Sequence, residues 1–369
     1  MPIRTRRRAA SIAALTNLLE LGPDSAERFV RNLGWPRYRA HQILRWLHRR
    51  RVRDIQRMTD LSQAERARLS AIGRIGRLED CQILRSVDGT CKFLARLEDG
   101  LLVESVLIPD AGRLTLCLST QVGCTLDCRF CLTGQMGLKR NLRAHEIVDQ
   151  VLTVQDHLEA GERLTNLVLM GMGEPLANLE AVSEAITRLT NSSWGLGIAA
   201  RRITLSTAGL APRLKDVAAL EVNLAVSLNA TTNEQRDRLM PAVNRLYPLE
   251  ELLAACRDYI LLSRRRLTFE YVLLDGVNDR EQDAKRLTKL LNGMRCKVNL
   301  IPFNEFPSSP FKRPTDSAVL RFQSALRHAR LDVFVRKSKG RDVLGACGQL
   351  GRLADGQEPA LLTLAGVSC

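Results

Sequence analysis

The sequence predicts an α/β fold, a partial (β/α)6 barrel with an all-helical domain before it and a C-terminal extension after it. Six strand-like runs alternate with mostly helical segments between residues 114 and 304, the order of a parallel sheet that curls into a barrel. Residues 15–80 instead show three short helical patterns. We therefore divide the chain into a basic helical accessory domain at 1–80, a β-hairpin linker at 81–112, the barrel at 113–340, and a C-terminal loop and tail at 341–369.

The helical domain is predicted from helix start and stop signals. A serine that can cap a helix and a glycine that can end it are found in "SAERFVRNLG", and "LSQAERARLSAIG" has a serine near its start. The segment between them, "YRAHQILRWLHRR", places Ile43, Leu44 and Leu47 on one stripe, with basic groups elsewhere. These three segments indicate a small domain of short helices.

Positive charge is concentrated in the same domain. Residues 1–80 contain 18 Arg, no Lys and 8 acidic residues, and so carry ten of the fifteen excess positive charges of the chain. A basic face of this kind attracts phosphate backbones through the release of counterions. A generally basic, soluble surface is the alternative, but the concentration of charge at one end of the chain favours nucleic acid.

The hydrophobic period changes after residue 81. Apolar and polar residues alternate around "EDG" in "KFLARLEDGLLVESVLIP", which predicts a hairpin. A helix is predicted at 144–158, after the first barrel strand. The barrel strands themselves are predicted at 114–119, 164–171, 202–209, 223–230, 267–276 and 297–304.

Chemically unusual residues follow five of these strands. They belong to "CTLDCRFC", "GMGEP", "STAG", "SLNA" and "PFNEF". Such polar residues often only cap the next helix. In parallel β/α folds, however, the chemistry lies on the loops that leave the carboxyl ends of the strands. Recurrence at successive strand ends therefore favours one shared site.

Three cysteines on one loop indicate a metal centre. Cys124, Cys128 and Cys131 supply thiolates, which suit zinc and iron–sulfur clusters. Structural zinc needs a fourth ligand at short spacing, and neither Cys117 nor His145 gives a normal zinc pairing. A 4Fe–4S cluster with one iron left unligated by the protein accommodates three cysteines and leaves a position for a small molecule. We expect the cluster, with zinc as the alternative.

Composition limits the other classes of protein. No apolar run approaches the roughly 20 residues of a membrane helix, so no membrane association is expected. Ten mostly scattered cysteines indicate a reducing compartment, and we expect a cytoplasmic protein. The basic start of the chain is predicted to be a solvated arm, with an organelle transit peptide as the alternative. The cysteines that match no motif are expected to be structural or incidental: Cys81, Cys91, Cys256, Cys296 and Cys369.

The motifs resemble those of a known superfamily. The cysteine loop is similar to the radical S-adenosylmethionine motif, and "GMGEP" resembles the Gly-Glu-Pro motif of the same superfamily. A closer resemblance, to the ribosomal RNA adenine-C-methyltransferases, runs in order over residues 90–350. It includes "VESVLIP", "LCLSTQVGC", "GQMGLKRNL", "LMGMGEPLAN", "YVLLDGVND", "VNLIPFN" and "ACGQL", and "YRAHQILRWLH" and "MTDLS" extend it into the helical domain. The resemblance implies a radical-SAM type of partial barrel.

The resemblance also implies a reaction. Members methylate carbon 2 of adenine 2503 in 23S rRNA, and many also methylate adenine 37 in tRNA, with two S-adenosylmethionine molecules per turnover. Cys124, Cys128 and Cys131 would hold a 4Fe–4S cluster whose open iron binds S-adenosylmethionine. One electron would cleave the sulfonium and yield a deoxyadenosyl radical. An adenine ring carbon is electrophilic and carries no acidic proton, so a radical route replaces ordinary methyl transfer.

Three further residues take roles from the same resemblance. The radical would abstract hydrogen from a methyl group carried by Cys347, and the resulting methylene would add to adenine. Cys117 would resolve the adduct and form a disulfide with Cys347, and Glu104 would be the proton acceptor. From the residues alone, Cys347 could be a small filler, Cys117 a buried strand cysteine and Glu104 a solvated carboxylate.

Cofactor contacts follow in the same way. Asn229 stands where many members have His, which preserves hydrogen bonding but not charge. Asp342 lies further from Cys347 than the acidic residue of many members, which affects the expected geometry of the carrier loop. The implied contacts to S-adenosylmethionine are Gly173, Glu174, Ser206, Ser227, Leu228, Asn229 and Asn304.

Alternative functions remain at this point. Methylation of carbon 8 of the same rRNA adenine shares all of these motifs, and the housekeeping carbon-2 activity is favoured. A non-catalytic RNA-binding protein with a structural cluster would need neither Cys117 nor Cys347, and a radical enzyme that activates another protein would not need the basic domain. The expected partners are 23S rRNA, tRNA and a reducing protein such as flavodoxin or ferredoxin, and the expected state is a monomer.

Overall fold

The computed structural model describes residues 15–307 and 309–351. Its contacts divide the chain into two compact units. Unit 1 combines residues 1–77 with Ser193–Gly195, and unit 2 contains the remainder. The tail beyond residue 351, with Cys369, and most of the basic start lie outside the described residues.

Unit 1 contains the three predicted helices. A short parallel strand pair connects its two ends, so the unit is not entirely helical. The apolar stripe of the second helix is buried, with Ile43, Leu44 and Leu47 each 1% exposed. The elements are β1 (Thr16–Asn17), α1 (Pro23–Asn32), α2 (Tyr38–His48), α3 (Gln63–Ile72) and β2 (Gly73–Arg74), with single 3-10 turns at Leu18–Glu20 and Ile55–Arg57.

The first helix, α1, begins at Pro23 after Gly22, and so starts before the serine that the sequence suggested as its cap. The start of α3 shows why that helix begins at the predicted serine. Ser62 Oγ accepts a hydrogen bond from Glu65 N at 3.2 Å, and Glu65 Oε2 accepts one from Ser62 N at 2.7 Å. This reciprocal cap satisfies two backbone donors that the first turn of a helix would otherwise leave free. Arg39 of α2 also bonds Glu65, at 3.0 Å, and so ties α2 to α3.

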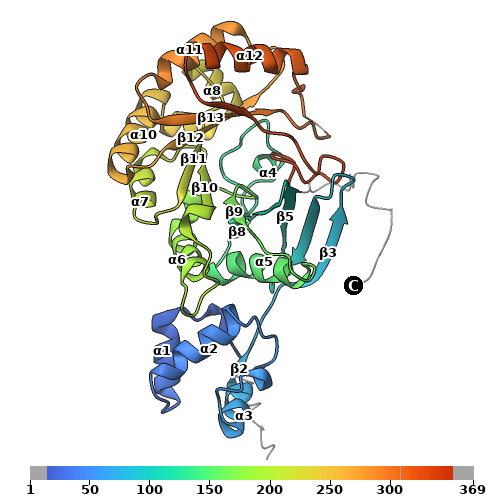
Figure 1. The fold of residues 1–369 in the computed structure, drawn as a ribbon, viewed down its shortest axis with the longest axis vertical. Coiled ribbons are helices and arrows are strands. Elements are labelled where there is room, and N and C mark those ends of the chain that lie inside the picture. The colour runs from blue at the N-terminus through green and yellow to red at the C-terminus, as the bar shows by residue number, and fades with distance from the viewer. Residues whose placement is uncertain (1–14, 308, 352–369) are drawn as a thin grey trace, which may run out of the picture. The chain divides into compact units, whose positions relative to one another are not determined.

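Unit 2 is built on one ten-stranded sheet whose parallel part is the predicted barrel. The six expected strands are confirmed, and a seventh parallel strand follows them (Figure 1). Strands β14 and β3 stand at opposite ends of the sheet order, so the barrel is open. The parallel strands are β6 (Arg113–Cys117), β9 (Asn166–Leu169), β10 (Ile203–Thr207), β11 (Asn223–Ser227), β12 (Leu267–Leu273), β13 (Cys296–Pro302) and β14 (Val333–Val335).

Three antiparallel strands extend the same sheet. They are β3 (Glu79–Arg85), β4 (Cys91–Arg96) and β5 (Leu102–Asp110). The predicted hairpin is β4 and β5, and β5 pairs with β6 over its last residues, with Val106 opposite Cys117. The segment expected as a linker is therefore continuous with the barrel sheet, and we call β3–β5 the antiparallel extension.

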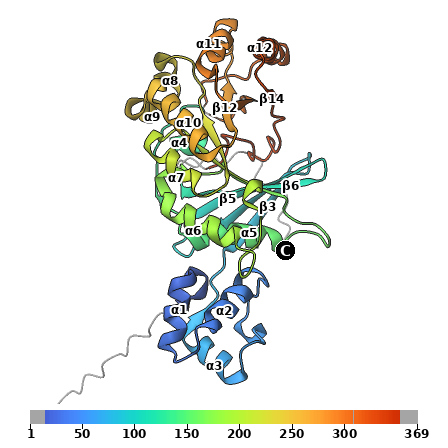
Figure 2. The same ribbon diagram turned by 60° about the vertical axis from the view of Figure 1, so that its left-hand side comes forward.

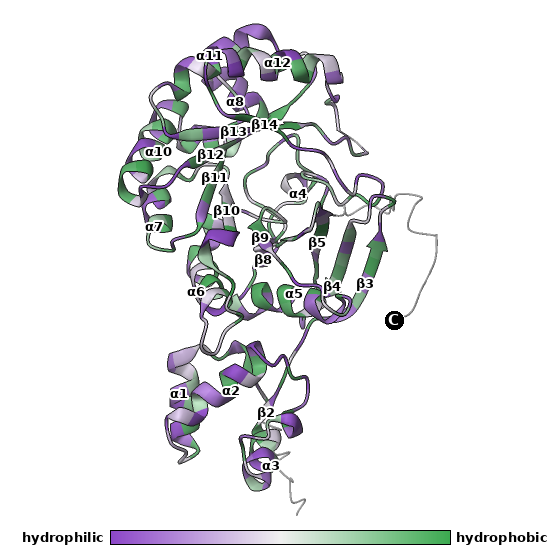
Figure 3. Ribbon diagram, in the orientation of Figure 1, coloured by the Kyte–Doolittle hydropathy of each residue, from purple (hydrophilic) through white to green (hydrophobic). Residues whose placement is uncertain are grey.

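Helices cover the outer side of the curved sheet (Figures 1 and 2). Strand residues such as Leu205, Phe269 and Leu300 are fully buried, and the strands are mostly apolar in colour (Figure 3). None of the described helices is both long and apolar enough to span a membrane. The longer helices are α5 (Ala144–Asp156), α6 (Leu179–Thr190), α10 (Leu249–Ser263), α11 (Glu281–Leu291) and α12 (Asp316–His328), and shorter elements are β7 (Gln121–Val122), α4 (Leu132–Gln135), β8 (Arg140–Asn141), α7 (Leu214–Ala218), α8 (Asn233–Leu239) and α9 (Pro241–Leu246).

Candidate active site

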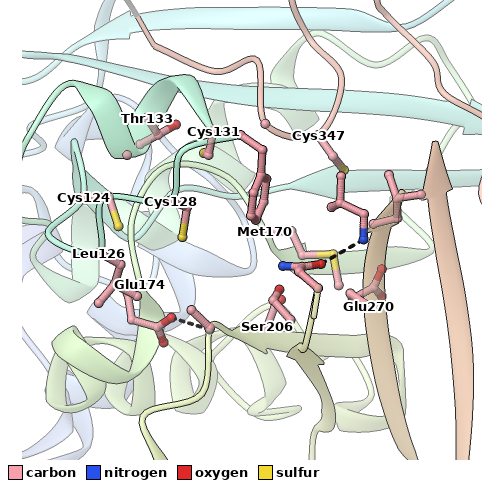
Figure 4. A pocket seen from close by; sticks show the side chains of 18 of the residues that line it. Cys124, Leu126, Cys128, Cys131, Thr133, Met170, Glu174, Ser206, Glu270 and Cys347 are labelled. Carbon is pink, nitrogen blue, oxygen red and sulfur yellow. Dashed lines mark hydrogen bonds between the residues drawn. The ribbon is translucent and has the colours of Figure 1, made fainter. Parts of the chain in front are cut away.

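One cavity at the carboxyl ends of the parallel strands collects most of the predicted site residues (Figure 4). It is bounded by the cysteine loop after β6, the loops after β9, β10 and β11, and the segment that follows β14. The predicted residues that line it are Cys124, Cys128, Cys131, Gly173, Glu174, Ser206, Ser227, Asn229, Asn304 and Cys347.

The cysteine loop is held by close backbone contacts. Gly123 has a φ of +80°, and a Cβ there would lie 1.8 Å from the carbonyl oxygen of Gly137. A Cβ on Gly134 would come within 2.9 Å of Cys128 N. Only glycine fits these two positions, because a side chain would collide with backbone rather than with a flexible neighbour. The spacing of the three thiols is therefore set by the fold of the loop.

The thiols are in a dry environment. Burial raises the pKa of Cys124 to about 12 and that of Cys128 well above its ordinary value. Among the described residues, no group of three or more His, Cys, Asp or Glu converges on a point that would hold a single ion. Ligands of a cubane cluster bind different iron atoms and need not converge in this way. Three half-buried cysteines on one loop that is held by close backbone contacts thus fit a cluster.

Glu174 connects two of the strand-end loops. Its Oε1 accepts a hydrogen bond from Leu176 N at 2.9 Å, and its Oε2 accepts one from Ala208 N at 2.7 Å. Burial raises the pKa of Glu174 to about 7, although both backbone donors lower it. The preceding Gly173 has a φ of +99°, and a Cβ there would lie 2.5 Å from Gln121 Cβ. The Gly-Glu pair therefore allows close packing and fixes the position of the "STAG" loop.

Asn229 has an unusual backbone conformation, and its side chain contacts two other segments. Its φ of +58° lies in the left-handed region, which Asn tolerates better than most residues. Its Oδ1 accepts a hydrogen bond from Val272 N at 2.8 Å, and its Nδ2 lies 3.4 Å from Met240 Sδ. The side chain that replaces the common His is therefore held between β12 and the loop after α8.

Two buried oxygen acceptors in the cavity have no hydrogen-bond donor among the described residues: Asn304 Oδ1 and Glu270 Oε2. Asn304 is 2% exposed and Glu270 3%. Their other polar atoms are used, since Asn304 Nδ2 donates to Cys347 O at 3.1 Å and Asn299 Nδ2 donates to Glu270 Oε1 at 2.9 Å. A buried acceptor without a partner costs about 1–3 kcal/mol. These acceptors fit S-adenosylmethionine, whose ammonium and hydroxyl groups are donors.

Glu270 and Arg336 were not predicted from the sequence, although both line the cavity. The available signal for Glu270 was a single charged residue inside an apolar run, "LTFEYVLL", whereas Arg336 only begins the basic segment of "VFVRKSKG". The pKa of Arg336 is raised, above all by the neighbouring Cys347 sulfur and then by Glu270 and Cys117. This guanidinium therefore places positive charge beside both of the predicted reactive cysteines.

Three predicted residues do not line the main cavity. Cys117 lines a smaller cavity that shares Cys347, Asn304 and Arg336 with it, and burial raises the pKa of Cys117 to about 12. Glu104 is 2% exposed rather than solvated, and it forms an ion pair with Lys92.

Leu228 is the third. It is fully buried, its N–H donates to Glu270 O, and its carbonyl accepts from Ala230 N. Its role as a cofactor contact stays a prediction.

Comparison with known proteins identifies the family. Residues 16–75 match the ribosomal RNA large subunit methyltransferase N-terminal domain, and residues 118–288 match the radical SAM superfamily. A dual-specificity RNA methyltransferase RlmN from Syntrophobacter fumaroxidans is 52% identical, over 88% of this chain and 94% of that protein. One from Syntrophus aciditrophicus is 47% identical, over 90% and 96%. The chain belongs to the RlmN family.

A solved structure supports the same assignment. The crystal structure of a radical SAM methyltransferase from Sphaerobacter thermophilus is 44% identical to this chain, with a TM-score of 0.86. The match covers 90% of this chain and 98% of that one. The predicted family and fold class are therefore confirmed, and membership of the radical SAM superfamily implies a 4Fe–4S cluster and S-adenosylmethionine as cofactors.

A buried arginine supports the cysteine loop of this RlmN-family chain. Arg236 is fully buried on α8, and no carboxylate among the described residues forms an ion pair with it. It donates to three neutral oxygens, Ala208 O at 2.7 Å, Tyr247 O at 3.0 Å and Asn244 Oδ1 at 3.2 Å. Burial lowers the pKa of Arg236 to about 10, so it remains charged at neutral pH. Its helix ends against the cysteine loop, where Arg129 N donates to Leu239 O at 2.9 Å.

We expect Arg236→Met to lower the free energy of unfolding by about 2–4 kcal/mol, because three buried oxygens lose their donor. Urea denaturation followed by circular dichroism measures the change. Arg257→Met, at an exposed position on α10, is the matched control and should stay within about 0.5 kcal/mol of the wild type. An Arg236→Met variant as stable as this control would show that the hydrogen bonds contribute little.

Proposed function

We propose that this RlmN-family chain methylates carbon 2 of adenine 2503 in 23S rRNA and of adenine 37 in tRNA, with Cys347 as the methyl carrier. One observation supports the carrier chemistry above all others. Cys117 and Cys347 stand 230 positions apart in the sequence, yet they line the same small cavity. A structural cluster alone would require neither of them to be there.

The residues of the main cavity would bind and shield the cofactors. Cys124, Cys128 and Cys131 would hold a 4Fe–4S cluster, which with S-adenosylmethionine supplies a radical able to abstract hydrogen from a methyl group. Asn304 Oδ1 and Glu270 Oε2 would accept hydrogen bonds from donors of the bound S-adenosylmethionine. The apolar walls of the cavity, among them Leu126, Phe130 and Phe303, exclude water, which would otherwise compete for those donors.

Cys347 and Cys117 would each take part in a different covalent step. Cys347 would accept a methyl group from S-adenosylmethionine as a thioether, with S-adenosylhomocysteine as the leaving group, and the Arg336 guanidinium lines the cavity beside it. After hydrogen is abstracted from that methyl group, the carbon would bond to the adenine ring. The adduct would return one electron to the cluster, which would supply the electron that cleaves S-adenosylmethionine. The Cys117 sulfur, after losing its proton, would then attack the Cys347 sulfur, so that a sulfur–sulfur bond forms and the carbon–sulfur bond of the adduct breaks. The electron pair of that bond would stay on the carbon, which takes up a proton to complete the methyl group. Glu104 is proposed to accept the proton from the adenine ring.

Unit 1 is proposed to bind the RNA. Several of its arginines are exposed on the helices α1 and α2, among them Arg28, Arg31 and Arg45. Contacts of this kind act on phosphates and add affinity without reading sequence. The choice between rRNA and tRNA, and between carbon 2 and carbon 8, would then depend on unit 2.

Cys347→Ala and Cys117→Ala should fail at different steps. Without the carrier, RNA methylation should fall by roughly 10³-fold or more and no RNA–protein adduct should form. Without the resolving thiol, a covalent adduct through Cys347 should accumulate. Mass spectrometry of the protein and of the digested RNA measures both outcomes and identifies the methylated carbon, including carbon 8.

Cys81→Ala, at a half-buried cysteine outside every motif, is the control and should turn over normally. Methylation by Cys347→Ala would exclude the carrier mechanism. Normal turnover by Cys117→Ala would exclude only the resolving role.

Protein purified without oxygen should contain about four iron and four sulfide per chain. Cys128→Ala should lose the cluster and its absorbance, because the remaining two thiols cannot hold it in place. Iron, sulfide and zinc analysis measures this, and Cys296→Ala should keep the full complement. One zinc per chain with no sulfide would contradict the cluster assignment.

Replacing Arg28, Arg31 and Arg45 together with Gln should weaken RNA binding and flatten its salt dependence. Each lost phosphate contact should reduce the slope of log affinity against log salt by about 0.7–0.9. Titration of a labelled tRNA at several salt concentrations measures the slope. The matched control replaces three exposed arginines of unit 2, Arg257, Arg321 and Arg330. An equal loss in both triple variants would indicate a general charge effect.

A further inference from the structure

A buried ion pair lies outside both cavities and inside the antiparallel extension. Lys92 Nζ on β4 lies 2.9 Å from Glu104 Oε2 on β5, and the two side chains are 7% and 3% exposed. Such a pair is costly to bury, since desolvation offsets much of the attraction between the charges. Neither residue lines a cavity among those described. The pair therefore needs a purpose other than direct contact with a ligand.

Both members also bond to the loop that carries Cys347. Lys92 Nζ donates to Leu344 O at 3.3 Å, three residues before the cysteine. Glu104 Oε2 accepts from Gly351 N at 3.0 Å, four residues after it. The ion pair thus holds both ends of the segment 344–351, which we call the carrier loop.

The conformation of the carrier loop shows that it is held and not relaxed. Leu344 has a φ of +50°, which is unfavourable for a residue with a large side chain. A residue stays in that region only where its surroundings fix it. Its carbonyl oxygen is the group that Lys92 bonds, so the ion pair acts at the strained position itself.

The other anchors of the carrier loop lead to the cysteine loop. Leu132 N donates to Gly348 O at 2.8 Å, and Thr133 Oγ1 donates to Leu350 O at 2.5 Å. The segment just before the carrier loop is tied to the extension, where Ser86 Oγ bonds Asp342 Oδ1 at 2.5 Å. Cys347 therefore sits between the cluster loop on one side and the Lys92–Glu104 pair on the other.

We propose that Lys92 and Glu104 are positioning residues that clamp the carrier loop and fix Cys347 against the cavity. While the clamp is closed, Glu104 Oε2 is occupied by Lys92 and by Gly351 N, so these contacts would have to open before it accepts a proton from adenine. This inference rests on the proposed function in one respect, that Cys347 is the methyl carrier. The clamp itself predicts a property of Cys347 that can be measured without any turnover.

The test measures how fast Cys347 reacts in cluster-containing, full-length protein. A pulse of iodoacetamide without oxygen, followed by peptide mass spectrometry, gives the alkylation rate of each cysteine. Lys92→Met and Glu104→Gln should each raise the rate at Cys347 by about tenfold or more, because each removes a charge-assisted contact that keeps the loop closed. The rate at Cys81 serves as an internal reference and should change less than about twofold.

A double variant and a matched pair complete the design. Removing one member leaves the other charge buried and unpaired, which can impair folding. Lys92→Met combined with Glu104→Gln removes both charges. It should alkylate Cys347 faster than the wild type but no faster than the faster single variant, because the two residues act on one loop. The control removes the exposed pair between Glu281 and Lys285 on α11, which should leave Cys347 unchanged.

Methylation of Cys347 separates the clamp from a proton acceptor. Peptide mass spectrometry after incubation with S-adenosylmethionine and a reductant, before RNA is added, measures the methylated fraction. A clamp predicts that Lys92→Met and Glu104→Gln both reduce this fraction. A base that acts only on the RNA adduct predicts that neither variant does so, and that Glu104→Gln alone fails after RNA is added.

The proposal is overturned if the folded double variant alkylates Cys347 at the wild-type rate. It is also overturned if Lys92→Met methylates Cys347 and RNA normally. Absence of methyl-Cys347 in the wild type would instead contradict the proposed function, and the alkylation result would still decide whether the clamp exists. The two failures are therefore distinguishable.

Discussion

The return of the chain onto the antiparallel extension is the interaction on which the rest of the active site depends. The part of the sequence that matches the radical SAM superfamily, residues 118–288, contains the cluster loop and much of the cofactor cavity. Cys347 and the strands β3–β5 lie outside it. Because β5 pairs with β6, the extension shares the sheet of the barrel, and the segment after β14 can bond to both. Cys117 on β6 and Cys347 consequently line the same cavity without any change in the barrel.

Burial of charge is the recurring feature of this arrangement, and each buried charge joins segments that are distant in sequence. Glu174 joins the loops after β9 and β10, Arg236 joins α8 to the loop that follows β10, and Lys92 and Glu104 join the extension to the carrier loop. Where water is excluded, each of these hydrogen bonds is stronger, and a conformation that lacks one of them is higher in free energy. A radical reaction needs this property, because a reactive carbon must meet one partner and no solvent.

The sequence predicted the parallel strands and the cluster loop because both are local signals. Apolar runs bounded by turns define the strands, and three cysteines within eight residues define a metal loop. How deeply a side chain is buried depends on the whole fold and not on its neighbours in the sequence. The burial of Lys92 and Glu270 could therefore not be predicted, because a charged residue in a strand is normally expected to face solvent. Leu228 was predicted to contact the cofactor, but it does not line the main cavity. Its neighbours Ser227 and Asn229 line the cavity, whereas side chains alternate along the chain here, so that of Leu228 points into the core.

The shared cavity of Cys117 and Cys347 could not be predicted from any pattern in the residues. Neither spacing nor composition relates the two, and the prediction rested on the resemblance alone. The structure supplies the missing physical reason, which is the register of β5 against β6. Val106 stands opposite Cys117 and packs with Leu350 of the carrier loop, while Glu104, two residues earlier on the same face of β5, bonds the end of that loop. One strand face thus positions Cys117 and the loop that contains Cys347 together, so a one-residue shift in this register would separate them.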